Sequence, residues 1–156
     1  MTMNYWLFKS EPYAYSIDDL KNESDGVGRW DGIRNYQARN LLRDDIKIGD
    51  QVLFYHSSCK NVGIAGFAEV TSEPYPDPLQ FDPESKYFDP KSDLENPRWV
   101  CLDIQYKAHV KKFLPLSQIK QNSELEEMVL VKRGRLSVQP VTESEWDAIK
   151  KLTMNG

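Results

Sequence analysis

Residues 30–43, WDGIRNYQARNLLR, combine one tryptophan with two asparagines and three arginines in a chain that is acidic overall. Trp30 stands before Asp31-Gly32, a pair that favours a turn and is a poor start for a helix. Asn35 can cap a helix that begins after it. The stretch is therefore either an amphipathic helix with a solvated basic face, or the wall of a pocket that holds a flat, partly anionic ligand.

Three further groups of polar residues stand at or near the ends of predicted strands: Lys9-Ser10, Tyr55-His56-Ser57 and Arg133 to Ser137. The strands 5–9 and 51–56 are both apolar and aromatic, which favours their pairing. Their polar ends can then converge on one rim, near Trp30 and Asn35. Such a rim suits a flat heterocycle, since bases stack on aromatic rings at roughly 1–3 kcal/mol. Alternatively, Trp30 is a core residue at a loop–helix junction, and the residues alone leave both interpretations open.

Other kinds of site find little support. The glycines at 26, 28 and 32 form neither G-x-G-x-x-G after a strand nor a G-x-x-x-x-G-K-[ST] loop, which argues against a nucleotide-phosphate enzyme. His56 and Cys59 would need a third metal ligand from a distant segment, and we expect no metal and no cofactor. Ser57 follows His56 without a G-x-S-x-G elbow, and strand neighbours point to opposite faces, which argues against a hydrolase.

The composition is typical of a soluble globular protein. The 156 residues are 40% hydrophobic and 28% charged, which fits one domain spanning 1–156. A net charge of −4 argues against nucleic-acid binding by the whole surface but allows a local basic patch. The two cysteines suggest no disulfide framework, and the N-terminal residues do not resemble a signal peptide. We expect a cytoplasmic protein without a membrane segment.

Sequence patterns predict short helices and strands in mixed order. The expected elements are a strand at 5–9, a helix from Ser16, a loop at 23–32, a helix from Asn35 to about 44, strands at 51–56, 62–71 and 99–110, short helices at 116–121 and 123–127, one or two strands around Gly134 within 129–141, and a helix from Thr142 to Leu152. Six of the nine prolines fall in 74–97 among aromatic residues, which indicates an ordered, functional loop. The whole predicts an α+β domain on a partly closed mixed β-barrel of five to six strands, with short flanking helices.

Several segments together resemble the EVE domain family. The matching motifs cover almost the whole chain in order: FKSEP (8–12), WDGIRNYQARN (30–40), KIGDQVLFYHS (47–57), GIAGFAEV (63–70), FDPESKYFDPKS (81–92), PRWVCLDI (97–104) and RLSVQPV (135–141). The resemblance implies a PUA-like barrel related to PUA, ASCH and YTH domains. It also implies a non-catalytic module that receives a modified base. The expected base is chiefly a modified cytosine in DNA, and a modified base in RNA is the less favoured expectation.

The resemblance also implies where such a base would bind. The pocket-forming residues would be Ser10, Trp30, Asn35, Tyr55, His56 and Ser57. The rim that meets the nucleic-acid backbone would be Lys9, Arg29, Arg34, Arg39, Arg135 and Ser137. In related YTH domains the segment corresponding to 81–99 supplies cage aromatics, and here Tyr87, Phe88 and Trp99 are the candidates.

Three hypotheses follow for the function. The first is a reader in which a flipped or single-stranded modified base stacks on Trp30, while its phosphates meet Arg29, Arg34 and residues 132–135. The second is an enzyme acting on a modified base or nucleoside, with His56 or a pocket carboxylate as general base. The third is a module that uses the same pocket to bind a small heterocycle or a protein.

Overall fold

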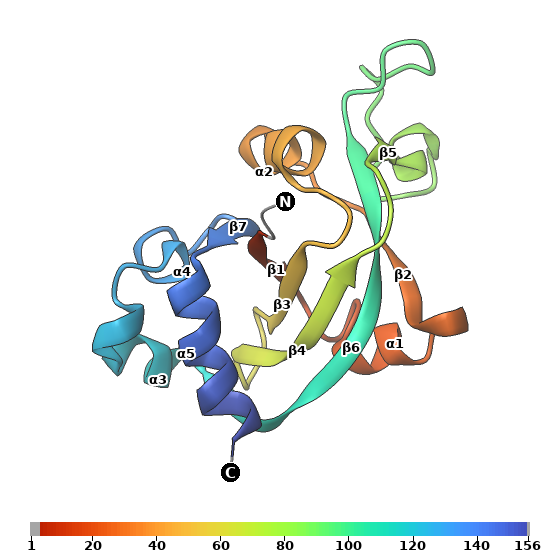
Figure 1. The fold of residues 1–156 in the computed structure, drawn as a ribbon. Helices are drawn as coiled ribbons and strands as arrows, with labels where there is room; N and C mark the ends of the chain where they lie inside the picture. Colours follow the sequence, from red (N-terminus) through yellow and green to blue (C-terminus); the bar gives the residue numbers. More distant parts are fainter. Residues whose placement is uncertain (1–3, 156) are drawn as a thin grey trace.

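The protein is built on one strongly coiled, mixed β-sheet with helices packed around it (Figure 1). The structure, a computed structural model, describes residues 4–155. The strand order is β2-β6-β4-β3-β1-β7, and β5 pairs with β6. The strands are β1 (Tyr5–Ser10), β2 (Val27–Trp30), β3 (Gln51–His56), β4 (Gly63–Val70), β5 (Tyr75–Pro76), β6 (Val100–Pro115) and β7 (Val138–Val141).

The α+β class is therefore confirmed, but the barrel of five to six strands is not. The sheet has seven strands and stays open, because the edge strands β2 and β7 do not pair with each other within residues 4–155. Both edge strands have only four residues, which limits how far either can extend around the sheet. The extra strands come from segments expected to be loops, since 27–30 lies inside the predicted loop 23–32 and 75–76 inside the predicted loop 74–97.

The helices are short, apart from the last one. They are α1 (Ile17–Lys21), α2 (Tyr36–Asn40), α3 (Leu116–Gln121), α4 (Val129–Lys132) and α5 (Glu143–Met154). The predicted caps are present, since Asn35 Oδ1 accepts from the N–H of Ala38 and Thr142 forms a capping box with Glu145. The segment 129–141 begins with α4 instead of a strand. Among residues 4–155, no helix combines the length and apolar character that a membrane crossing requires.

The predicted pairing of the two aromatic strands is confirmed. β1 and β3 run parallel, with Ser10 opposite His56. Because parallel strands end at the same edge of a sheet, their polar ends lie together. The N–H of Ser57 donates to the carbonyl of Ser10 at 2.9 Å, which joins the two strand ends directly.

The sheet separates two hydrophobic clusters, and the alternation of side chains along each strand decides which cluster a residue joins. In β3, Val52 and Phe54 pack with Trp30 and α1, whereas Leu53 and Tyr55 pack with α5. The two faces differ in their helices: α3, α4 and α5 gather on one side in Figure 1, and α1 lies on the other.

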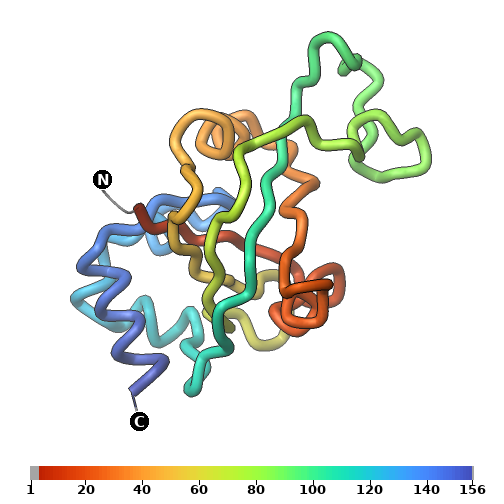
Figure 2. The backbone as a smooth tube through the Cα atoms, turned by 45° about the vertical axis from the view of Figure 1, so that its right-hand side comes forward, coloured from red at the N-terminus to blue at the C-terminus, as the bar shows by residue number. Residues whose placement is uncertain are grey.

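The proline-rich loop is ordered by one buried side chain, Gln80. Its Nε2 donates to the carbonyls of Asp77 (2.7 Å) and Trp99 (2.8 Å). Its Oε1 accepts from the N–H groups of Trp99 and Arg98 and from the Ser92 hydroxyl. Gln80 thus joins both ends of a segment that projects from the rest of the molecule in Figure 2.

We expect Gln80→Ala to lower the free energy of unfolding by at least about 1–3 kcal/mol, because it leaves several buried backbone groups unpaired. Urea denaturation measures this loss. Limited proteolysis should also cut within 82–97 faster than in the wild type. Gln121→Ala, at an exposed helix end, is the control and should stay within about 0.5 kcal/mol. Equal stability of the two variants would contradict the anchoring role.

Candidate functional site

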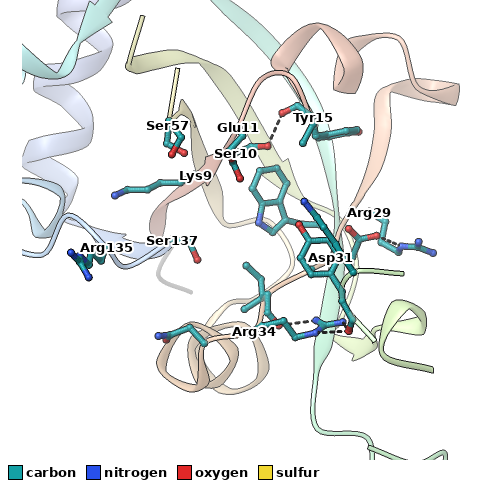
Figure 3. Close-up of a pocket in the computed structure, with 18 of the residues that line it drawn as sticks. Lys9, Ser10, Glu11, Tyr15, Arg29, Asp31, Arg34, Ser57, Arg135 and Ser137 are labelled. Atoms are coloured by element: carbon teal, nitrogen blue, oxygen red, sulfur yellow. Dashed lines mark hydrogen bonds and ion pairs between the residues drawn. The ribbon is translucent and has the colours of Figure 1, made fainter. Parts of the chain in front are cut away.

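A cavity of about 800 Å³ opens where β1 and β3 end (Figure 3). Its volume lies within the range of about 300–1,000 Å³ that is usual for small-ligand sites. The walls come from five stretches of chain: 9–15, 29–35, 57–58, 86–87 and 134–137, with Glu23 beside them. Segments far apart in sequence are thus brought together by the parallel β1–β3 pair and by β2.

Trp30 serves both as a core residue and as a wall of this cavity. It is the last residue of β2, paired with Leu102, and only 5% of its surface is exposed. Its ring centroid lies 5.2 Å from that of Phe8, 5.3 Å from Phe54 and 6.3 Å from Tyr15. The surface left free lines the cavity. Trp30 is therefore a core residue whose remaining surface lines the cavity, and it ends a strand instead of beginning a helix. Stacking of a ligand on it stays a prediction.

Three predicted polar residues, Ser10, Asn35 and Ser57, also line the cavity. Ser10 Oγ donates to the carbonyl of Tyr15 at 2.6 Å, so its lone pairs remain able to accept. Asn35 Oδ1 accepts from Ala38 at 3.0 Å, which leaves the two amide N–H donors for a ligand. The cavity therefore offers donors and acceptors beside an aromatic surface.

Tyr55 and His56 do not line the cavity, which corrects two predictions. Tyr55 is 2% exposed and packs on the opposite face of the sheet, because it alternates with Phe54. His56 Nε2 accepts the N–H of Ile17 at 3.1 Å, and its ring packs edge-on against Phe54. Burial lowers the pKa of His56. This histidine therefore holds α1 against β3.

The cavity has cationic groups on two sides. The cations Lys9 and Arg135 lie on one side in Figure 3, together with the hydroxyl of Ser137, and the cation Arg29 lies on the other side. Lys9 donates to the carbonyl of Gly134, and burial lowers the pKa of this lysine. Arg29 pairs with Asp31 at 2.8 Å but remains partly exposed. Of this group, Arg135 is the most available, since it is exposed and has no ion pair within residues 4–155.

Arg34 lines the cavity as part of its wall. Its guanidinium pairs with the fully buried carboxylate of Asp77 at 3.0 Å. It also donates to the carbonyl of Tyr87 at 2.8 and 3.0 Å and to that of Ile33 at 2.8 Å. These bonds use four of its five N–H groups, so little of the guanidinium is left for phosphate.

Arg39 is not among the residues that line the cavity, and its expected contact with the nucleic-acid backbone stays a prediction. It donates to the carbonyl of Arg98 at 3.0 Å and to Asn40 Oδ1 at 2.8 and 3.1 Å. Its guanidinium lies against the rings of Tyr36 and Trp99.

Among the three candidate loop aromatics, Tyr87 is the one that reaches the cavity. Phe88 is 40% exposed, and Trp99 is buried with its indole N–H donated to Asp89. The Tyr87 ring lies against Gly32, where an added Cβ would come within 3.0 Å of it. Since Gly32 also has a φ of +79°, a glycine is required here both by the turn and by the close approach.

Some lining residues were not predicted. Tyr15 contacts Trp30 edge-on and donates to Glu23 at 3.0 Å, while burial raises its pKa above its ordinary value. The others include the acidic groups Glu11, Glu23 and Asp31 and the cation Lys86. The sequence signal for Tyr15 was its position five residues after Ser10, in the short connection between β1 and α1. Within the described part of the chain, no three His, Cys, Asp or Glu side chains are grouped to hold a metal ion.

Comparison with known proteins matches this chain to the EVE domain model over residues 4–152. Human thymocyte nuclear protein 1 is 41% identical over 166 residues, covering 96% of this chain and 73% of the relative. A crystal structure of human THYN1 in complex with 5-methylcytosine-containing DNA is 41% identical, with a TM-score of 0.90 and 96% of each chain covered.

Two further solved structures are similar. A Pseudomonas syringae protein is 50% identical, with a TM-score of 0.90 and coverage of 95% of this chain and 98% of the other. The YTH domain of Zygosaccharomyces rouxii MRB1 is 14% identical with a TM-score of 0.57, which relates the folds alone. By the family match over residues 4–152 and by these relatives, the chain belongs to the EVE domain family.

Proposed function

We propose that this protein binds a modified nucleobase, unpaired or flipped out of its strand, in the cavity beside Trp30. A modified cytosine in DNA is the first candidate and a modified base in RNA the second. One observation carries the proposal: the cavity joins an aromatic surface to unused polar groups, in a chain 41% identical to a human protein whose structure holds 5-methylcytosine DNA.

The arrangement of groups supports a planar ligand with polar edges. Trp30, Tyr15 and Tyr87 provide aromatic surface, on which any base can stack. Ser57 and Asn35 can donate to ring nitrogens or carbonyl oxygens and so distinguish one base edge from another. Extruding a base from a duplex costs a few kcal/mol and is least costly for an unpaired base.

The cations around the opening support contact with phosphate. Arg135, Arg29 and Lys86 are exposed residues that line the cavity, and Arg135 and Arg29 lie on opposite sides of it in Figure 3. The chain as a whole carries a net charge of −4, so this attraction acts only near the opening. Such contacts position the strand without reading its sequence.

The proposal includes no catalytic step. His56, the candidate general base, already accepts the N–H of Ile17 and does not line the cavity. Each of the three cavity carboxylates has a partner: Asp31 pairs with Arg29, Glu23 accepts from the Tyr15 hydroxyl, and Glu11 accepts from the Tyr13 hydroxyl. These contacts favour a binding role for the site over an enzymatic one.

A single-stranded DNA oligonucleotide with one 5-methylcytosine should bind more tightly than the same oligonucleotide with cytosine. We expect the logarithm of the affinity to fall with the logarithm of the salt concentration, with a slope of about −2 if Arg29, Lys86 and Arg135 each meet a phosphate. Fluorescence anisotropy at two salt concentrations measures both effects. Equal affinity for both oligonucleotides would contradict base reading, and a matched RNA pair decides between DNA and RNA.

Two cavity substitutions should separate binding from stability. Ser57→Ala removes a hydroxyl that makes no hydrogen bond within residues 4–155, so we expect the free energy of unfolding to stay unchanged. The free energy of ligand binding should weaken by roughly 0.5–1.5 kcal/mol. Trp30→Ala leaves a void among three rings and should lower the free energy of unfolding by about 3–5 kcal/mol. Calorimetric binding and urea denaturation measure these changes. Ser117→Ala, exposed on α3, is the control and should alter neither quantity.

Incubation with modified DNA or free modified nucleosides should leave their masses unchanged, because the proposed role is binding alone. Mass spectrometry of the digested oligonucleotide measures this. A base released, deaminated or demodified in proportion to protein concentration would establish the enzymatic alternative instead.

A further inference from the structure

A row of stacked groups leads from the cavity wall to the outer surface of the protein. The Arg34 guanidinium lies 5.4 Å from the ring centroid of Tyr87 and 5.4 Å from that of Trp99. Trp99 stacks in turn on Tyr36, with centroids 4.7 Å apart and planes at 26°. Arg39 lies 4.7 Å from the Tyr36 centroid and 6.0 Å from that of Trp99. The row therefore begins at a cavity residue, Tyr87, and ends at Tyr36.

Tyr36 keeps one ring face open. The residue is 50% exposed, although its ring is stacked on Trp99, which is almost completely buried. The separations among Tyr36, Trp99 and Arg39 form a triangle, so the guanidinium lies beside the stack and not on the far side of Tyr36. The outer face of the ring is thus available, with a cation at its edge.

The groups beneath Tyr36 are held firmly. The indole N–H of Trp99 donates to Asp89 at 2.8 Å, and its backbone N–H donates to the buried Gln80. Arg39 is tethered to the carbonyl of Arg98 at 3.0 Å. A ring fixed in this way loses little conformational entropy when a ligand stacks on it. Packing alone would explain the buried Trp99 but not an open aromatic face beside a fixed cation.

The position of Tyr36 fits a second base on the same strand. Asn35, its neighbour in the chain, lines the cavity, so a strand whose base enters the cavity passes close to the start of α2. Stacking on aromatic rings is tolerant of base identity, and an adjacent arginine adds attraction for the base or its phosphate.

We propose that Tyr36, backed by Trp99 and flanked by Arg39, is a stacking platform for the nucleobase next to the one held in the cavity. This inference rests on the proposed function. It makes the ligand a strand with at least one unpaired base beside the modified one, and it assigns the platform no preference for base identity.

The test combines a variant with a change in the ligand. Single-stranded oligonucleotides with one 5-methylcytosine are prepared with an abasic site at each neighbouring position in turn. For the wild type, an abasic site at one neighbouring position should weaken binding roughly 5- to 100-fold. For Tyr36→Ala, binding of the intact strand should fall by a similar factor, and the same abasic site should have little further effect.

Three controls complete the test. Tyr36→Phe keeps the ring and should bind like the wild type. Phe113→Ala removes an exposed aromatic residue from the end of β6 and should leave binding unchanged. The free nucleoside 5-methyl-2′-deoxycytidine should bind wild type and Tyr36→Ala equally, because it occupies the cavity alone.

The outcomes distinguish the two proposals. If the wild type prefers 5-methylcytosine but no neighbouring abasic site weakens binding, the platform is wrong and the proposed function stands. If Tyr36→Ala weakens nucleoside and strand equally, Tyr36 belongs to the cavity and the platform is also wrong. If the wild type shows no preference for the modified base, the proposed function fails, and the platform fails with it.

Discussion

The buried carboxylate of Asp77 joins the proline-rich loop to the wall of the cavity. It accepts from the N–H of Gly32 at 2.8 Å, from Arg34 at 3.0 Å and from the N–H of Leu79 at 2.8 Å. A buried charge is tolerated only when it is paired and hydrogen-bonded, and this carboxylate meets both conditions. This carboxylate therefore fixes the positions of the proline-rich loop, the turn after β2 and Arg34 relative to one another.

The consequences of this contact extend across the site. With Arg34 held by Asp77, its remaining N–H groups bind the carbonyl of Tyr87 and bring that ring against Gly32. The Arg34 guanidinium also lies 5.4 Å from the ring centroid of Trp99, and Trp99 supports Tyr36. One ion pair thus orients both a cavity wall and the exposed stack behind it. An arginine of a basic-looking motif serves here mainly to position aromatic rings.

Much of the site followed from local patterns. The aromatic strands at 5–9 and 51–56 predicted a pair, and the parallel pairing places Ser10 and Ser57 at one edge. The capping chemistry of Asn35 predicted the start of α2 and a polar residue there. The predictions failed where a choice depended on distant partners. Tyr55 lies on the other face of the sheet because side chains alternate along β3. The strand β2 was not predicted because its four residues, one of them a glycine, are too few to show an alternating pattern.

The sequence by itself determined the family, the helix caps, the main strands and the types of residue gathered around the cavity, because these depend on near neighbours and on recognisable motifs. Only the tertiary structure decided which of them face the cavity. Arg34 finds its carboxylate 43 residues away, and Trp30 divides its surface between the rings of Phe8, Phe54 and Tyr15 and the cavity. Such contacts depend on the order of the strands in the sheet and on which face of the sheet each side chain occupies. Local sequence patterns do not predict that order.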